Sequence, residues 1–157
     1  MSRYAGSPFD PMNASFDSDR LIDRIYEAGL IPSLWPALLG ELGAAVGGNG
    51  GFLFGVRDGY TSAVNSVEYD QIVPVFMKDG WSERDPNLPR AIALNHAGFV
   101  TDYDLLSEEE IATNDVYCNF YRKHGLGYRA GTIIPMPSGD SIAIVIPRHQ
   151  DRGPVPQ

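Results

Sequence analysis

Apolar residues near the N-terminus recur at the spacing of an amphipathic helix. Leucine, isoleucine and alanine side chains between positions 21 and 28 fall on one stripe, which predicts a helix over residues 18–29. A second apolar stripe predicts a helix over residues 33–46, and the glycine cluster at 47–51 ends it. The folded part of the chain is therefore expected to begin with two consecutive helices.

Four later runs are short, rich in apolar residues and bounded by turn signals, as strands are. Asp58-Gly59 predicts a hairpin turn between the first two runs, and "PSGD" at 137–140 predicts one between the last two. Hairpins require antiparallel pairing of their strands. The predicted strands are residues 51–56, 61–68, 129–136 and 141–148.

The segment between the two hairpins shows helical patterns separated by turns. Pro74 lies inside the first of these patterns and predicts a kink. Ser107 and Glu110 have the spacing of a capping box, so a helix is expected to begin there. Helices are predicted over residues 69–81 and 87–94, from 107, and from about 114 to 124, with a brief strand or extended loop at 98–104.

This order of elements predicts the fold class. Two helices, two strands, several helices and two strands indicate an α/β fold of the α+β kind. We expect an antiparallel sheet of about five strands, flanked by helices on both faces, of PAS or GAF type. Residues 1–16 are expected to form a flexible arm, residues 17–149 a single PAS/GAF-like domain, and residues 150–157 the start of a linker.

The composition restricts the possible partners. The chain has 157 residues, of which 43% are hydrophobic and 20% charged, and its net charge is −8 without any run of basic residues. Because nucleic acids and anionic membranes are bound through clustered Lys and Arg, we expect this chain to bind neither by itself. Cys118 is the only cysteine, so no internal disulfide is possible, and we expect a cytoplasmic location.

The residues that could carry catalysis do not form a known motif. His96, His124 and His149 are far apart, and no nucleophile-elbow, zinc-protease or phosphate-loop pattern occurs. The acidic run 108–110 is better explained by the first turn of a helix than by a metal site. We therefore expect a protein that is not an enzyme, without a metal ion or cofactor.

The middle of the chain is rich in aromatic residues and contains one unusual carboxylate. Aromatic side chains with few polar groups can line a cavity for a small molecule, although each can equally be ordinary core. Asp85 follows an apolar helical pattern and precedes Pro86. It could cap the helix that follows, or it could accept a hydrogen bond from a ligand N–H.

Two segments resemble a known family of sensor domains. "ERDPNLPRA" at 83–91 is similar to an Asp-Pro-x-x-x-Arg-Ala block, and "KHGLGYRAGTIIPMPSGDSIAIVI" at 123–146 is similar to the strand and hairpin of the same family. A looser match covers residues 21–42. The chain thus resembles the N-terminal, autoinducer-binding-type sensor domain of LuxR-family helix-turn-helix transcriptional regulators.

The resemblance implies a ligand pocket with altered specificity. The lactone receptors of this family hold their ligand with a Tyr-x3-Trp-x3-Tyr helix and the Asp-Pro aspartate, and counting back from Asp85 places Glu68, Ile72 and Phe76 at the three aromatic positions. Ile133 stands where those receptors keep a hydroxyl, so the ligand need not be an acyl-homoserine lactone. The expected ligand-binding residues are Tyr69, Ile72, Phe76, Trp81, Asp85, Tyr103, Thr132 and Ile133.

The resemblance also implies a function in quorum sensing or a related signalling process. The domain would bind a small, largely apolar molecule, form a homodimer, and control a DNA-binding domain that is absent from this chain. Two alternatives remain open at this point. A ligand-free PAS-like dimerisation module would contain no cavity, and a small α/β enzyme would place a shifted carboxylate within hydrogen-bond reach of His96 or His124.

Overall fold

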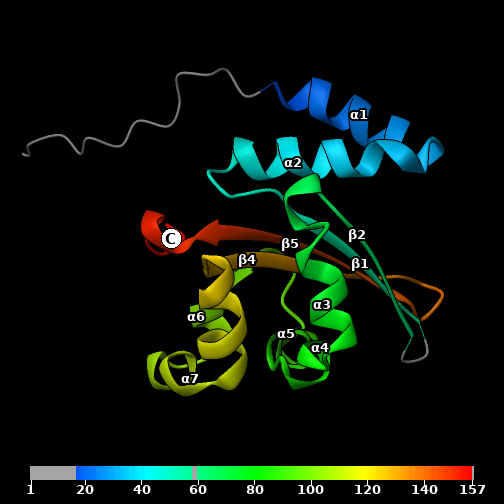
Figure 1. Ribbon diagram of the computed structural model, residues 1–157. Coiled ribbons are helices and arrows are strands. Elements are labelled where there is room, and N and C mark those ends of the chain that lie inside the picture. The colour runs from blue at the N-terminus through cyan, green and yellow to red at the C-terminus, as the bar shows by residue number, and fades with distance from the viewer. Residues whose placement is uncertain (1–16, 58–59, 157) are drawn as a thin grey trace, which may run out of the picture.

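The computed structural model describes residues 17–57 and 60–156, which form one sheet with helices on both of its faces (Figure 1). Helix α2 (Trp35–Ala45) covers one face, and α1 (Ser18–Leu30) packs on the side of α2 that faces away from the sheet. Both helices lie close to their predicted positions. The Asp17 side chain caps α1 by accepting a hydrogen bond from the Arg20 N–H. In the described residues, no helix is long and apolar enough to cross a membrane.

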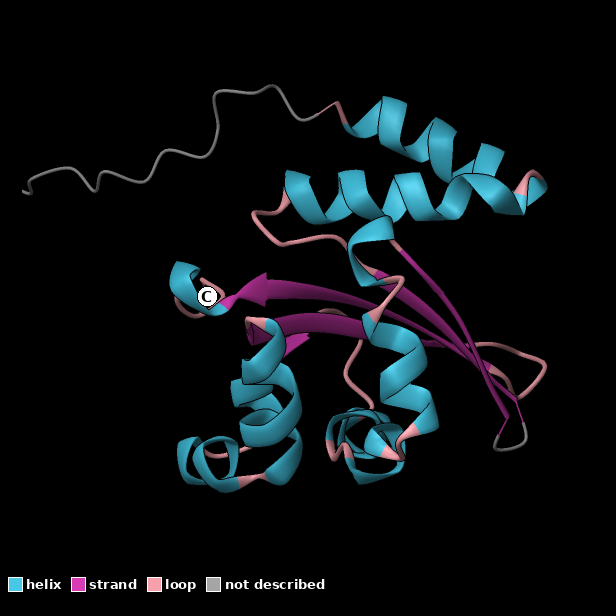
Figure 2. Ribbon diagram, viewed as in Figure 1, coloured by secondary structure: helices cyan, strands magenta, loops and turns pink. Residues whose placement is uncertain are grey.

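The sheet has five antiparallel strands in the order β2-β1-β5-β4-β3, which confirms the predicted fold class (Figure 2). The long hairpin β4–β5 lies at its centre, and β3 is a short edge strand. The predicted Asp58-Gly59 turn lies outside the described residues. The strands are β1 (Phe52–Arg57), β2 (Tyr60–Asn65), β3 (Val100–Thr101), β4 (Leu126–Pro135) and β5 (Ser141–His149).

The second face is covered by short helices. The prediction of a single helix over residues 69–81 was wrong, because the structure divides this segment into separate helical pieces. Gly80 adopts a left-handed conformation between the last two of them. Pro74 causes no kink, since it lies in the first turn of its helix, where an N–H has no intrahelical partner. The elements are α3 (Ile72–Lys78), α4 (Trp81–Arg84), α5 (Asn87–Leu94), α6 (Asp102–Leu105), α7 (Glu108–Thr113), the π-helical segment η3 (Tyr117–Tyr121) and a short 3-10 turn (Arg122–His124).

Two local predictions about helix ends are confirmed. Ser107 and Glu110 form a capping box at the start of α7, with each side chain bonded to the backbone N–H of the other residue. Gly125 ends the helical segment before β4 with a φ of 74°, a backbone conformation that residues other than glycine rarely adopt.

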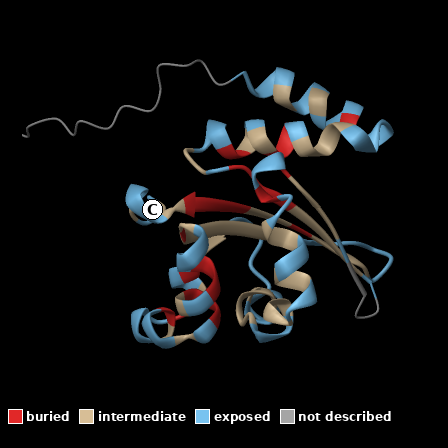
Figure 3. Cartoon of the chain, in the orientation of Figure 1, coloured by how far each residue is buried: buried red, intermediate tan, exposed pale blue. Residues whose placement is uncertain are grey.

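Burial divides the molecule into a core on each side of the sheet (Figure 3). On the α2 side, Leu38 and Leu39 are completely buried, and the glycine link after α2 lies close against Ile146 of β5. On the other side, an aromatic cluster includes Phe52 from β1 and Phe120 from η3. This second core is interrupted by a cavity.

Candidate functional site

A cavity of about 410 Å³ lies between the sheet and the segments α3, α4, α5, α6 and η3. This volume is within the range of pockets that hold small molecules, which is roughly 300–1,000 Å³. Most of its wall is apolar. The apolar part includes Phe52, Phe54, Ile72, Val73, Phe76, Leu88, Leu105, Phe120, Ile133 and Val145.

The register of the sheet explains why the sheet leaves space at the floor of the cavity. Phe54 of β1 pairs with Ala143 of β5, and Val145 of β5 pairs with Gly131 of β4. Because side chains alternate between the faces of a strand, the positions that face α3–α6 on the two central strands include one glycine and one alanine. The missing side-chain volume at Gly131 and Ala143, both in the cavity wall, leaves space above the sheet centre.

One end of the cavity is polar and is organised around Arg129 of β4. This guanidinium forms ion pairs with Asp85 at 3.2 Å and Asp102 at 3.1 Å, and its side chain is only 11% exposed. It also donates a hydrogen bond of 2.7 Å to the Tyr117 hydroxyl and lies 3.9 Å from the ring centre of Tyr121. Arg129 is therefore held by two carboxylates and two aromatic rings.

The cluster alters the protonation of its members. Burial alone would raise the pKa of Asp85, but the positive charge of Arg129 and hydrogen bonds from Tyr121 and Asn87 hold it below its ordinary value of 3.8. Burial alone would lower the pKa of Arg129, and the charges around it, led by Asp102, raise it well above the ordinary value. Burial also raises the pKa of the Tyr121 hydroxyl well above 10. Asp85 and Arg129 are consequently charged at neutral pH, and Tyr121 is neutral.

The hydrogen-bonding capacity of Asp85 is used within the protein. Its Oδ1 accepts bonds from the backbone and side-chain N–H groups of Asn87, and its Oδ2 accepts bonds from Tyr121 and Arg129. A carboxylate has about four acceptor positions, so these partners account for them. The Asn87 N–H belongs to the first residue of α5, whose N-cap residue is Pro86, so Asp85 satisfies an N–H group at the start of this helix and also lies in the cavity wall.

Asp102 differs from Asp85 in having an unused oxygen. The residue begins α6, lies in the cavity wall and is 5% exposed. Its Oδ1 accepts bonds from Tyr117 at 2.7 Å and Arg129 at 3.1 Å. Its Oδ2 is buried and has no hydrogen-bond partner among residues 17–57 and 60–156.

Five of the eight residues expected to contact a ligand lie in the cavity wall. The structure brings together Ile72, Phe76, Asp85, Thr132 and Ile133, from α3, the loop before α5, and β4. Their contact with a ligand stays a prediction.

The other three residues lie outside that wall. Tyr69 is buried, with its ring 4.4 Å from Phe52 and its hydroxyl bonded to the Asn49 carbonyl. Trp81 packs against Phe120 and the Arg84 guanidinium. Tyr103 is 40% exposed and faces Tyr128. These positions indicate structural roles for Tyr69 and Trp81.

The sequence identified Asp85 as a candidate but did not identify Arg129 or Asp102, the other charged members of the polar cluster. Arg129 is a charged residue inside a run of strand-forming residues, at a position facing the helices, and this was the available signal. Nothing in the sequence pairs it with Asp85, which is 44 residues away, or with Asp102, which is 27 residues away.

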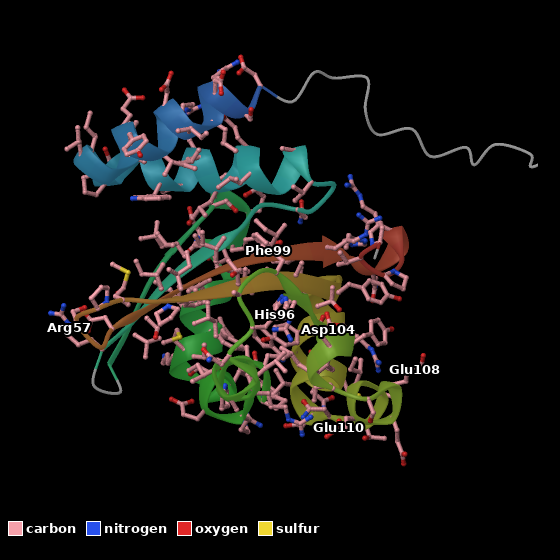
Figure 4. All side chains as sticks on the ribbon, turned by 180° about the vertical axis from the view of Figure 1, so that it is seen from behind. Arg57, His96, Phe99, Asp104, Glu108 and Glu110 are labelled. Carbon is pink, nitrogen blue, oxygen red and sulfur yellow. The ribbon has the colours of Figure 1, made fainter. Side chains whose placement is uncertain are left out.

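The histidines do not join this cluster. The ring of His124 packs 4.7 Å from Phe120, and His149 lies 3.3 Å from Asp151. His96 follows α5 and lies with Phe99 and Asp104 on the side seen in Figure 4. In the part of the chain that the structure describes, no three His, Cys, Asp or Glu residues could hold a metal ion.

The fold is that of ligand-binding domains of LuxR-type regulators. The sequence itself matches no described protein family and no curated protein. The structure, however, is similar to the VqsR ligand-binding domain from Pseudomonas aeruginosa, with a TM-score of 0.62 at 15% identity over 83% of this chain and 79% of that chain. The fold expected from the resemblance is therefore confirmed.

Two further solved structures share this fold. CepR2 from Burkholderia cenocepacia, an N-acylhomoserine-lactone-dependent LuxR-family transcription factor, has a TM-score of 0.66 at 14% identity over 83% of this chain and 75% of that chain. Escherichia coli SdiA has a TM-score of 0.54 at 15% identity over 83% of this chain and 56% of its own, and it has also been solved in complex with octanoyl-rac-glycerol.

Proposed function

We propose that this chain is the ligand-sensing domain of a LuxR-type transcriptional regulator. A small molecule with a largely apolar body binds in the cavity between the sheet and α3–α6. Binding shifts the dimerisation equilibrium, or the activity of a DNA-binding domain outside this chain, because the ligand has different affinities for two states of the protein.

The cavity is the observation that carries this proposal. The pocket is partly open, its wall is mostly apolar, and its volume of about 410 Å³ is within the range of pockets that hold small molecules. It lies beside Asp85, the residue that the family resemblance associates with the ligand. The ligand-free dimerisation module would contain no such space, so the cavity favours the sensor.

The enzyme alternative has less support. It required a carboxylate with a shifted pKa within hydrogen-bond reach of a histidine. The pKa of Asp85 is indeed lowered, but its side-chain partners are Asn87, Tyr121 and Arg129. All of its acceptor positions are used, which leaves no lone pair for general base catalysis.

A thermal-shift experiment tests the proposed function, with octanoyl-rac-glycerol as the probe because a structural neighbour binds it. A ligand at a hundred times its Kd stabilises the folded state by about 2.7 kcal/mol. For a domain of this size, that raises Tm by roughly 5–10 °C. Mass spectrometry of gently purified protein provides a second readout, because it detects a co-purified small molecule.

The matched control is Ala143→Phe, which fills the floor of the cavity from β5. This variant should lose both the thermal shift and any co-purified molecule while keeping its circular dichroism spectrum. An equal shift in the filled variant would mean that the probe binds elsewhere. The absence of a shift and of a co-purified molecule in the natural chain would contradict the sensor function.

A further inference from the structure

Helix α1 presents a stripe of large apolar side chains to solvent. Four of them follow one another at positions i, i+3, i+4 and i+8, which is the spacing of one side of a helix. Their exposed fractions are 49%, 38%, 73% and 86% in chain order, and Figure 3 shows α1 exposed along most of its length. The members of this α1 stripe are Ile22, Ile25, Tyr26 and Leu30.

The α1 stripe lies on the outside of the domain, away from the cavity. α1 packs against α2 and against the 3-10 turn Pro32–Leu34 that joins the two helices, and α2 separates it from the sheet (Figure 1). The cavity lies on the other face of the sheet, between the sheet and α3–α6. A molecule that covers the α1 stripe therefore does not compete with a ligand in the cavity.

The size of the α1 stripe fits an interface between two copies of the chain. From the exposed fractions, the stripe offers roughly 500 Å² per copy, and two copies together would bury about 1,000 Å², the lower limit for a specific protein interface. An exposed apolar patch of this size on a monomer is often functional. A single stripe per copy is therefore sufficient when two copies bury their stripes against each other.

The charge of α1 also favours a second copy over a highly charged partner. The helix has two basic and three acidic residues, which gives a formal charge of 2 − 3 = −1, whereas the whole chain has a charge of −8. One of its basic residues, Arg24, is already paired with Glu41 of α2. Two copies that meet at α1 avoid much of the repulsion that their net charge causes elsewhere, and a strongly basic or acidic partner gains little attraction there.

We infer that a second copy of this chain covers the α1 stripe, in a two-fold symmetric pair whose α1 helices pack against each other. A two-fold interface uses the same surface on both copies, so the stripe needs no different partner surface. The expectation of a dimer rests on the proposed function. The surface itself does not involve the cavity, so the pair forms without a ligand.

Sedimentation velocity over a series of protein concentrations, without any ligand, tests the inference. The natural chain should form a dimer. Ile22→Lys and Tyr26→Lys should each weaken the dimer at least tenfold, because each places an ammonium group in an apolar contact without a partner. Lysine also makes the acidic chain less negative, so stronger repulsion between the copies cannot explain the loss of the dimer.

Ile92→Lys is the matched control. Ile92 lies in α5, outside the cavity wall, and its exposed fraction of 49% equals that of Ile22. This variant should change the dimer affinity by less than twofold. All three variants should keep the circular dichroism spectrum and the thermal shift with octanoyl-rac-glycerol, which shows that the fold and the cavity are intact.

Three results would refute the inference. A natural chain that stays monomeric at every concentration shows that something other than a second copy covers the α1 stripe. A dimer that survives both stripe substitutions uses another surface. An equal effect of Ile92→Lys shows that the added charge, and not its position on α1, weakens the dimer.

The same measurements separate this inference from the proposed function. If the natural chain is monomeric but binds the probe, the sensor function stands and the α1 interface is refuted. If the chain dimerises through α1 while no probe binds and no small molecule co-purifies, the interface stands and the sensor function falls.

Discussion

Replacing Arg129 by methionine tests whether the polar cluster is held together as the structure indicates. Arg129 pairs with Asp85 and Asp102, whose side chains are 12% and 5% exposed, so its removal leaves two buried carboxylates without a cation. Breaking a buried ion pair in this way costs about 3–5 kcal/mol. For a domain of this size, Tm should fall by roughly 6–20 °C.

Urea denaturation measures this change in the free energy of unfolding. The matched control is Arg57→Met, because Arg57 forms a comparable ion pair with Asp140 but its side chain is 72% exposed, at the sheet end far from α6 and α7 (Figure 4). That variant should lose little stability, since exposed pairs contribute little. Adding Asp85→Asn and Asp102→Asn to Arg129→Met should restore at least half of the lost stability.

The pH dependence gives this prediction a second readout. In the natural chain the pKa of Asp85 is lowered, so its contribution to stability is present above about pH 4 and is lost as the pH falls through its folded pKa. Without Arg129, burial should raise that pKa, and the ionised carboxylate then destabilises the variant at neutral pH. The difference between the two proteins should therefore be largest near pH 7 and shrink toward pH 4. A difference below about 1 kcal/mol, or one that does not change with pH, would refute the role of Arg129.

Three further changes test other parts of the structure. Gly125→Ala should destabilise the domain by about 1–2 kcal/mol, because Gly125 has a φ of 74° and an added Cβ would lie 2.6 Å from the His149 ring. Gly29→Ala is the control, since Gly29 has no atom within 4 Å of an added Cβ and its replacement should not destabilise the domain. An equal effect of the two substitutions would contradict this prediction. Ser107→Ala should cost about 1 kcal/mol by removing the cap of α7, as measured by urea denaturation, and no change would mean that the capping box contributes nothing. The chain alone should form no specific complex with DNA in gel-shift assays at physiological salt, because its net charge is −8, and nanomolar binding would refute this expectation.

Local sequence patterns were sufficient for most of the elements. The apolar stripes placed α1 and α2 within one or two residues, and the capping box placed the start of α7. The "PSGD" turn defined the β4–β5 hairpin, because two strand-forming runs that flank a short turn have only one simple way to pair. Where the pattern failed, at residues 69–81, the cause was also local, since the left-handed conformation of Gly80 interrupts the helix.

The candidate site was only partly predictable. Asp85, Ile72, Phe76, Thr132 and Ile133 were selected from the family resemblance, and the structure places them in one cavity wall. The resemblance also suggested an aspartate free to bind a ligand. In the structure, both oxygens of that carboxylate accept hydrogen bonds from protein donors.

The sequence alone determined most of the secondary structure, the antiparallel pairing within the hairpins and the net negative charge, because each depends on residues close together in the chain or on composition. The tertiary structure decided the rest. The cavity exists because the register of β4 and β5 places Gly131 and Ala143 on the face that α3–α6 cover. Its polar end exists because three distant segments bring Arg129 between two aspartates. Periodicity shows which way a side chain points, but only packing decides what it meets.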